Sequence, residues 1–322
     1  MSVFLVSVIN LLKFAGKCGK IVYILVRGSV MTEITFDGLR ELIPQRGEKV
    51  HKGSFGTLLS VCGSARYRGA ALLSSEAALR CGCGILRLAS TERVCAAVAS
   101  SLPEVTFLPQ DEDECGAVCN FDCDGIFSEF KGITAILCGC GLTVSRSTSK
   151  AVNDIIRKSE VQLILDADAL NCVAAHPWIL TKAKMPPIIT PHWGEFARLC
   201  GCDASDIEKN AERSALEFAE KYNCIVVLKS HFTLIAAPEG ECFISNAGNA
   251  GLARGGSGDV LAGIIASFSV QGVGALNAAK LGVALHGAAA DVCAKRCGMT
   301  AMLPHDIITD IRDLLNERNI KE

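Results

Sequence analysis

The sequence has few aromatic residues, no excess of one charge and no hydrophobic run long enough to cross a membrane. Aromatic side chains make up 6% of the 322 residues, which argues against a surface on which nucleic-acid bases stack. Basic and acidic residues number 32 and 34, so the formal net charge is −2. The N-terminal apolar runs, 3–12 and 21–26, are shorter than the roughly 20 residues of a spanning helix. We therefore expect neither nucleic acid nor a membrane as a partner.

None of the 17 cysteines has a second cysteine at the C-x-x-C spacing of a zinc ribbon or a redox dithiol. Their number is odd, and most lie in apolar runs such as 137–140. This pattern favours cysteine as a small buried hydrophobic residue in a reducing compartment, which predicts a cytoplasmic protein. A redox or metal-binding role for some of them is the alternative.

The N-terminal segment does not have the form of a secretory signal. Its basic residues, Lys13, Lys17 and Lys20, follow the first apolar run, whereas a signal peptide has them before it. Met31 begins sequence that runs directly into an amphipathic pattern. We expect residues 1–30 to be an extension outside the fold, with Met31 as an alternative start, and residues 31–322 to form a single domain.

From residue 57 onward, short apolar runs alternate with helical patterns. This repeated order predicts an α/β fold with a mostly parallel central sheet and helices on both faces. In such sheets, ligands bind beyond the carboxyl ends of the strands. The expected strands are 57–62, 85–89, 135–138, 161–165, 187–190, 225–228, 232–236 and 242–245, and the main expected helices are 70–80, 152–158, 205–221, 259–268, 276–294 and 305–316.

A glycine-rich segment, 248–258, precedes the helix expected at 259–268. Backbone N–H groups of Gly255, Gly256, Ser257 and Gly258 can converge on an anion, and the helix N-terminus adds partial positive charge. The segment is not a Walker A loop, because no Lys-Ser/Thr pair follows the glycines. Asp259 would repel a phosphate, but it suits a base that deprotonates a hydroxyl attacking phosphorus. The alternative is that Asp259 only caps the helix.

Polar side chains follow two further predicted strands. His192 and Glu195 lie in the loop 190–195, whose alternative role is a turn followed by a helix that carries Glu195 in its first turn. The acidic turn 166–171 contains two aspartates and an amide. These groups could hold Mg²⁺ through water, or they could order the loop.

Three more segments are expected at carboxyl ends of strands, and they point to one crevice. The segment 63–70 contains two arginines that could bind an anionic substrate, 139–141 is glycine-rich, and the turn 229–233 could line a nucleotide site. Lys229 alone is weak evidence, since an exposed lysine at a strand end is ordinary. By contrast, the acidic stretch 110–114 is interpreted as a solvated loop.

Taken together, these segments resemble the NAD(P)H-hydrate dehydratase family, the carbohydrate-kinase-related domain of the ribokinase-like superfamily. The resemblance covers about residues 35–315, and an ordered set of motifs is far more specific than any one of them. The matching segments are 52–56, 69–70, 77–84, 139–142, 166–171, 190–195, 229–233, 248–263 and 286–289.

The resemblance implies a ribokinase-like fold and repair of damaged nicotinamide cofactor. Members remove water from the (6S) hydrate of NADH or NADPH and cleave ADP or ATP to AMP or ADP and phosphate, with Mg²⁺ bridging the phosphates. The resemblance also favours a homo-oligomer, a tetramer. It implies no protein side chain as a dedicated metal ligand.

The resemblance also assigns roles to residues by motif position. Ala70, Gly141, His192 and Asp259 would contact the hydrate, with Asp259 as the catalytic base. Gly258 and the turn 229–233 would hold the adenylate, and the amides of 255–258 would stabilise developing charge. The residues of that turn are Lys229, Ser230, His231, Phe232 and Thr233.

Two other functions remain open at this point. A small-molecule kinase of the same superfamily, such as one acting on a vitamin precursor, would use the same base, so the fold does not separate it from the dehydratase. A regulatory module that binds a nucleotide without turnover would tolerate loss of Asp259. The segments 190–195 and 249–251 favour the dehydratase.

Overall fold

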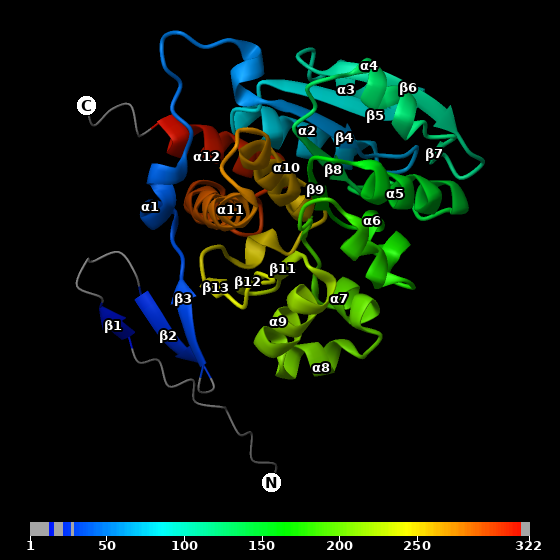
Figure 1. Ribbon diagram of the computed structural model, residues 1–322. Helices are drawn as coiled ribbons and strands as arrows, with labels where there is room; N and C mark the ends of the chain where they lie inside the picture. Colours follow the sequence, from blue (N-terminus) through cyan, green and yellow to red (C-terminus); the bar gives the residue numbers. More distant parts are fainter. Residues whose placement is uncertain (1–12, 16–21, 27–28, 317–322) are drawn as a thin grey trace.

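The protein is built around one β-sheet (Figure 1). A computed structural model describes residues 13–15, 22–26 and 29–316 of the chain, with side chains from residue 31 onward. The strands run in the order β1-β2-β3-β13-β12-β11-β10-β9-β8-β4-β5-β6-β7. They are β1 (Lys13–Ala15), β2 (Val22–Val26), β3 (Ser29–Glu33), β4 (Thr57–Val61), β5 (Ile85–Thr91), β6 (Thr106–Glu112), β7 (Val118–Cys119), β8 (Ala135–Cys138), β9 (Gln162–Leu165), β10 (Ile188–Ile189), β11 (Ile225–Lys229), β12 (Thr233–Ala236) and β13 (Cys242–Ser245).

The middle of the sheet is parallel. Strands β11, β10, β9, β8, β4, β5 and β6 pair side by side in parallel, and antiparallel pairs occur toward both edges. Side chains alternate between the two faces: in β4, Leu59 and Val61 belong to one apolar core, whereas Leu58 belongs to the other. The prediction of a mostly parallel sheet is confirmed.

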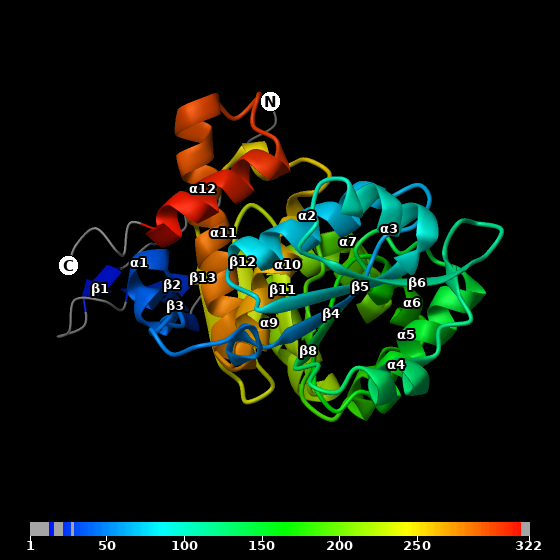
Figure 2. The ribbon, with the colours of Figure 1, turned by 90° about the horizontal axis from the view of Figure 1, so that it is seen from above.

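Helices cover both faces of the sheet (Figure 2). Helices α4 to α9 pack on one face, and α2, α3, α10 and α11 pack on the other, with α1 and α12 outside α10 and α11. They are α1 (Phe36–Leu39), α2 (Arg68–Arg80), α3 (Glu92–Ala99), α4 (Cys123–Glu129), α5 (Arg146–Lys158), α6 (Asp168–Val173), α7 (Trp193–Cys200), α8 (Ala204–Lys209), α9 (Ala211–Tyr222), α10 (Ser257–Val270), α11 (Ala275–Cys297) and α12 (Pro304–Asn316).

Helix α10 is central to one layer, because α2 and α11 pack directly against it. Two glycines permit this close packing. A Cβ atom on Gly263 would lie 2.2 Å from the carbonyl oxygen of Ser74 in α2, and one on Gly282 would lie 2.5 Å from Ile265 Cγ1. Close packing fixes the N-terminus of α10, where the glycine-rich segment ends.

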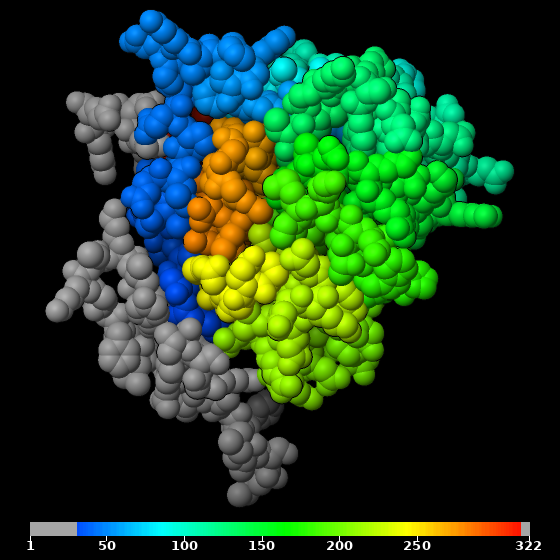
Figure 3. All heavy atoms as spheres, in the orientation of Figure 1, coloured from blue at the N-terminus to red at the C-terminus, as the bar shows by residue number. Residues whose placement is uncertain are grey.

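The predicted domain boundary at Met31 falls inside a strand. β3 pairs antiparallel with β2 and parallel with β13, so the described backbone of residues 13–33 extends one edge of the sheet. The Met31 side chain is buried in the core. Figure 3 shows the segment from Met31 through α1, in blue, beside α11, in orange. The prediction that residues 1–30 lie outside the fold stays a prediction, and most of them lie outside the described residues.

One expected helix, 205–221, is wrong in extent. The structure has two helices there, and the chain leaves helical geometry at Asn210, with φ −132° and ψ 31°. Helix α8 begins at Ala204, one residue before the expected start. Ile207 and Ala211 are both buried in the core beneath α4 to α9, so tertiary packing determines the break.

We predict that Gly263→Ala destabilises the protein by about 1–3 kcal/mol, because the added methyl overpacks the α2–α10 contact. The matched control is Gly69→Ala, also in a helix, where a Cβ would meet nothing within 4 Å. It should be neutral or stabilising by up to about 1 kcal/mol. Urea unfolding measures both values, and equal effects of the two changes would contradict the prediction.

Candidate active site

The carboxyl ends of neighbouring parallel strands bring the predicted segments together. Asp166 follows β9, Thr190 follows β10, Lys229 ends β11, and Cys140 lies just beyond β8. All of these strands are adjacent in the sheet. The N-terminus of α10 lies over the same edge, since α10 packs on β8 and β9.

The buried carboxylate of Asp166 organises this edge. Only 2% of Asp166 is exposed. Its Oδ1 accepts hydrogen bonds from Thr190 Oγ1 at 2.6 Å and from Lys229 Nζ at 2.7 Å, and the Cys140 thiol lies 3.7 Å from its Oδ2. Burial alone would lower the pKa of Lys229, but the carboxylates of Asp166 and Glu195 outweigh it, and the pKa is raised. Lys229 is therefore a charged, largely buried cation, and not the ordinary exposed lysine considered above.

Asp259 lies in the first turn of α10 and is not its cap. Gly256, with φ 100°, occupies the N-cap position, so Asp259 is the third helical residue. Burial and the nearby carboxylate of Asp166 raise the pKa of Asp259 to about 7, although the Lys229 ammonium acts in the opposite direction. A carboxyl group with such a pKa can exchange a proton near neutral pH. The capping alternative for Asp259 is therefore not what the structure shows.

The glycine-rich segment before α10 is fastened to α11. Asp291 accepts hydrogen bonds from Gly248 N at 3.0 Å and from Asn249 Nδ2 at 3.1 Å. Gly251 packs so closely on Met302 that a Cβ would lie 2.2 Å from its sulfur. Gly258 faces the buried cation, because a Cβ there would lie 3.2 Å from Lys229 Nζ.

Two buried polar atoms beneath this segment have no hydrogen-bond partner among residues 31–316: Ser257 Oγ and His286 Nε2. His286 comes from α11. Burial and the nearby Lys229 ammonium lower its pKa to about 4. The imidazole is therefore neutral at pH 7. Unpartnered buried polar atoms are costly, and they are typical of places where a ligand binds.

A cavity of about 1010 Å³ opens beside Asp259. Ala70, Gly141 and Asp259, three of the four residues predicted to contact substrate, line it together. Gly141, with φ 61°, is required there, because a Cβ would lie 2.7 Å from that of Ala70. Arg66, Tyr67 and Asp168 contribute further polar groups to the lining.

The fourth predicted contact, His192, is not among the residues that line the cavity. It caps α7: His192 Nδ1 accepts from the amides of Gly194 and Glu195, and Glu195 accepts from the His192 amide at 2.8 Å. The segment is thus the turn and helix start of the alternative interpretation. His192 still adjoins the turn 229–233, because Lys229 N donates to Pro191 O at 2.9 Å.

The turn 229–233 links β11 to β12 with Lys229 paired to Thr233. Ser230 is held by its hydroxyl, which donates to Phe232 O at 2.8 Å. The His231 ring lies edge-on to Trp193, with centroids 6.1 Å apart, and 4.4 Å from Phe232. Only Lys229 of this turn reaches the Asp166 carboxylate.

The acidic stretch near residue 112 is part of the cavity wall, which the sequence interpretation missed. Residues 112–116 line the cavity together with Arg93. Asp113 accepts from Cys115 N, Ala117 N and Ser145 Oγ, and this fixes the loop. An aspartate shortly before a glycine is typical of such a turn and was the available signal.

Of the two aspartates after β9, Asp168 orders the loop. Its Oδ2 accepts from Thr143 N at 2.8 Å and its Oδ1 from Asn171 at 3.3 Å. Asp166 and Asp259 remain as carboxylates near the N-terminus of α10. Together with Cys140 they place ligand atoms within 4.8 Å of one another.

Comparison with known proteins agrees with this geometry. Residues 58–313 match the family model described as NAD(P)H-hydrate dehydratase. The chain belongs to this family. It is 36% identical over 262 residues to the ADP-dependent (S)-NAD(P)H-hydrate dehydratase of Neisseria meningitidis, a match that covers 80% of this chain and 84% of the relative. The chain spans about half the length of bifunctional NAD(P)H-hydrate repair enzymes that it also matches.

Solved structures of the dehydratase family share the fold. The ADP/ATP-dependent NAD(P)H-hydrate dehydratase of Bacillus subtilis, co-crystallized with ATP/Mg²⁺, has a TM-score of 0.73 and 31% identity over 88% of this chain and 97% of that one. A ribokinase-like superfamily protein from Enterococcus faecalis has a TM-score of 0.77 and 25% identity over 88% and 95%. The expected ribokinase-like fold is confirmed.

We predict that Asp259→Asn stabilises the protein at pH 8 by about 1–3 kcal/mol. The carboxyl pKa is about 7 when folded and near 3.8 when unfolded, so the unfolded chain loses this proton first as pH rises. Ionisation of Asp259 therefore lowers the free energy of unfolding progressively between pH 3.8 and pH 7, and the loss is constant above pH 7. Chemical unfolding should show a smaller gain at pH 5 than at pH 8, and an equal gain at both would contradict the assignment.

Proposed function

We propose that this chain removes water from the (6S) hydrate of NADH or NADPH, coupled to cleavage of ADP or ATP. The observation that carries the proposal is the position of Asp259. Its carboxyl lies in the first turn of α10, at a helix N-terminus of the kind that can bind an anion, and it also lines the cavity beside it. A group in that place can serve two ligands at once. The named activity of the Neisseria and Bacillus relatives supports this choice of substrate.

The first step is transfer of the terminal phosphoryl group to the substrate hydroxyl. Asp259 takes the hydroxyl proton as the oxygen attacks phosphorus, and the bond from phosphorus to the bridging oxygen breaks. AMP or ADP leaves with that electron pair. Hydroxide is a poor leaving group, whereas a phosphate ester is a good one. Loss of phosphate and of a proton from the neighbouring ring carbon then restores the dihydropyridine.

The amides of Gly255, Gly256, Ser257 and Gly258 would stabilise the transferring phosphoryl group. They lie at the positive end of α10, and the first amides of a helix have no partner within it. Gly258 brings this backbone close to Lys229 Nζ, whose charge adds to the attraction. A phosphate oxygen would also provide a partner for the Ser257 hydroxyl.

The turn 229–233 would hold the adenylate, with Lys229 near the phosphates, and with the exposed ring of His231 and the partly buried ring of Phe232 beside the base. The hydrate would occupy the cavity against Ala70 and Gly141. Arg66, which lines the cavity, suits the phosphates of a dinucleotide. His192 would contact the hydrate only at the margin of this site.

The residues present fit Mg²⁺ bound mainly through the nucleotide. Asp166 is already paired with Lys229 and Thr190, and the Cys140 thiol is a poor ligand for a hard cation. Mg²⁺ usually keeps several waters and takes one or two carboxylates plus substrate phosphates. Asp166 and Asp259 would orient those waters, and the ion would neutralise phosphate charge.

The compartment and the assembly are also part of the proposal. Among the described residues, no helix is long and apolar enough to cross a bilayer. The described cysteines are free thiols, which suits a reducing cytoplasm. A homotetramer remains the expected assembly.

We predict that Asp259→Asn lowers kcat/KM for NADH hydrate by about 10²–10⁴-fold while the protein stays folded. The assay follows recovery of reduced-nicotinamide absorbance with Mg²⁺ and either ADP or ATP, and chromatography identifies the nucleotide product. The control is Asp124→Asn, in the first turn of α4, where the carboxylate pairs with Lys158 at the surface. It should retain full activity.

The same assay separates the other candidate functions. A stable phosphorylated product without recovery of the dihydropyridine would indicate a kinase. Binding of both ligands without turnover would indicate a regulatory module. Full activity of Asp259→Asn would remove the proposed base.

We further expect kcat/KM to rise with pH up to about 7 and to level off above it. Asp259 must be ionised to accept a proton, and burial and Asp166 raise its pKa to about 7. Below that value the rate should fall about tenfold per pH unit. A profile that is flat between pH 5.5 and 7.5 would contradict Asp259 as the base.

A further inference from the structure

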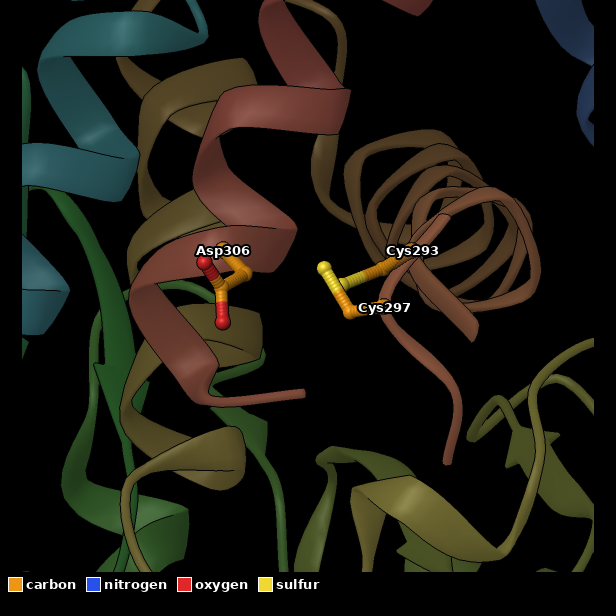
Figure 4. A group of neighbouring side chains, drawn as sticks. All are labelled: Cys293, Cys297 and Asp306. Carbon is orange, nitrogen blue, oxygen red and sulfur yellow. The ribbon is translucent and has the colours of Figure 1, made fainter. Parts of the chain in front are cut away.

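Two cysteines and an aspartate meet at the junction of α11 and α12, away from the cavity (Figure 4). Cys293 and Cys297 lie one turn apart near the end of α11, and Asp306 lies in the first turn of α12. Their sulfur and carboxylate oxygen atoms all lie within 4.8 Å of one another. In Figure 4 the sulfur atoms of Cys293 and Cys297 point from α11 toward Asp306 in α12.

The neighbouring groups make few contacts with these three ligand atoms, and the Cys293 sulfur accepts one long hydrogen bond, of 3.8 Å, from a terminal nitrogen of Arg296. Arg296 is committed to Asp310, with its Nε 3.1 Å from Oδ1 and its terminal nitrogen 2.9 Å from Oδ2. Leu303 N donates to Asp306 Oδ2 at 2.8 Å, which fixes the carboxylate and leaves Oδ1 free of backbone bonds. His305 Nε2 lies 3.8 Å from that Oδ1.

We propose that Cys293, Cys297 and Asp306 form a binding site for a soft divalent cation, of which Zn²⁺ is the natural example. Two thiolates and a carboxylate select zinc or cadmium and disfavour Mg²⁺ and Ca²⁺. Ligand atoms of a tetrahedral zinc site lie about 3–4 Å apart, so modest side-chain rotation closes the present group. His305 or a water supplies the fourth ligand.

Metal binding at this site should release protons from the thiol ligands, and this release can be measured. Burial raises the pKa of the Cys293 thiol to about 12, and the Asp310 carboxylate acts in the same direction. A metal ion must displace this proton, because the thiolate is the ligand form of cysteine. Binding is therefore accompanied by proton release, and Arg296 helps to balance the negative charge of the ligands.

The bound ion would tie α12 to α11. Cys297 is half-buried, which provides a route for entry from solvent. The loop between the two helices contacts the glycine-rich segment, because Arg254 donates to Thr300 O at 2.9 Å and Gly251 packs on Met302. An ion at the helix junction would thus stiffen the support of that segment.

The experiment titrates the full chain with Zn²⁺, and with Cd²⁺ as a spectroscopic probe. We expect a thiolate-to-cadmium charge-transfer band, release of protons when the ion binds, and a rise in Tm with Zn²⁺. Cys297→Ser and Asp306→Asn should each weaken binding by about tenfold or more. Both are chosen to keep the fold, since Cys297 is partly exposed and asparagine can still accept the Leu303 hydrogen bond.

The matched controls are Cys200→Ser and Asp313→Asn, which remove an exposed thiol and an exposed carboxylate elsewhere. They should bind as the unmodified protein does. The proposal is overturned if Cys297→Ser and Asp306→Asn retain full affinity, or if Cys200→Ser abolishes binding. It is also overturned if the unmodified protein shows neither the band nor the Tm rise.

Discussion

The buried ion pair of Asp166 and Lys229 is the interaction on which the rest of the site depends. It joins the carboxyl ends of β9 and β11, which are separated in the sheet by β10 and in the sequence by 63 residues. Removing two charges from water is costly, and the cost is met only because Thr190 adds a second hydrogen bond to the carboxylate. Loss of either partner would leave a buried charge unpaired, so the three strand ends are held in one geometry.

This ion pair also sets the properties of Asp259. The Asp166 carboxylate raises the pKa of its neighbour and the Lys229 ammonium lowers it, so the result depends on how the pair is placed. Burial adds the largest contribution and is produced by the packing of α10 between α2 and α11. The pKa of Asp259 near neutrality is therefore a product of the core as much as of the site, and the ionised carboxylate of this proposed base reduces stability above that pH.

Much of this arrangement could be predicted from the sequence, and the failures have physical causes. The strand ends and the glycine-rich segment were predicted because apolar runs and clustered glycines can be recognised from neighbouring residues in the sequence alone. The pairing of Asp166 with Lys229 was not, since nothing local specifies which side chains meet across a sheet. The stretch 110–114 was interpreted as solvated because acidic loops usually are, although residues 112–116 line the cavity. The break at Asn210 was missed because packing overrides helical periodicity.

The attachment of the glycine-rich segment to α11 has a thermodynamic consequence. Asp291 holds Gly248 and Asn249, and Met302 fills the space beside Gly251. The chain is thus already in the shape that presents its amides, and little conformational entropy remains to be lost when an anion docks. Because the segment is preorganised, little of the favourable contact energy is lost to ordering the chain, and an anion would bind more tightly. Association would also not be slowed by a loop that must first become ordered.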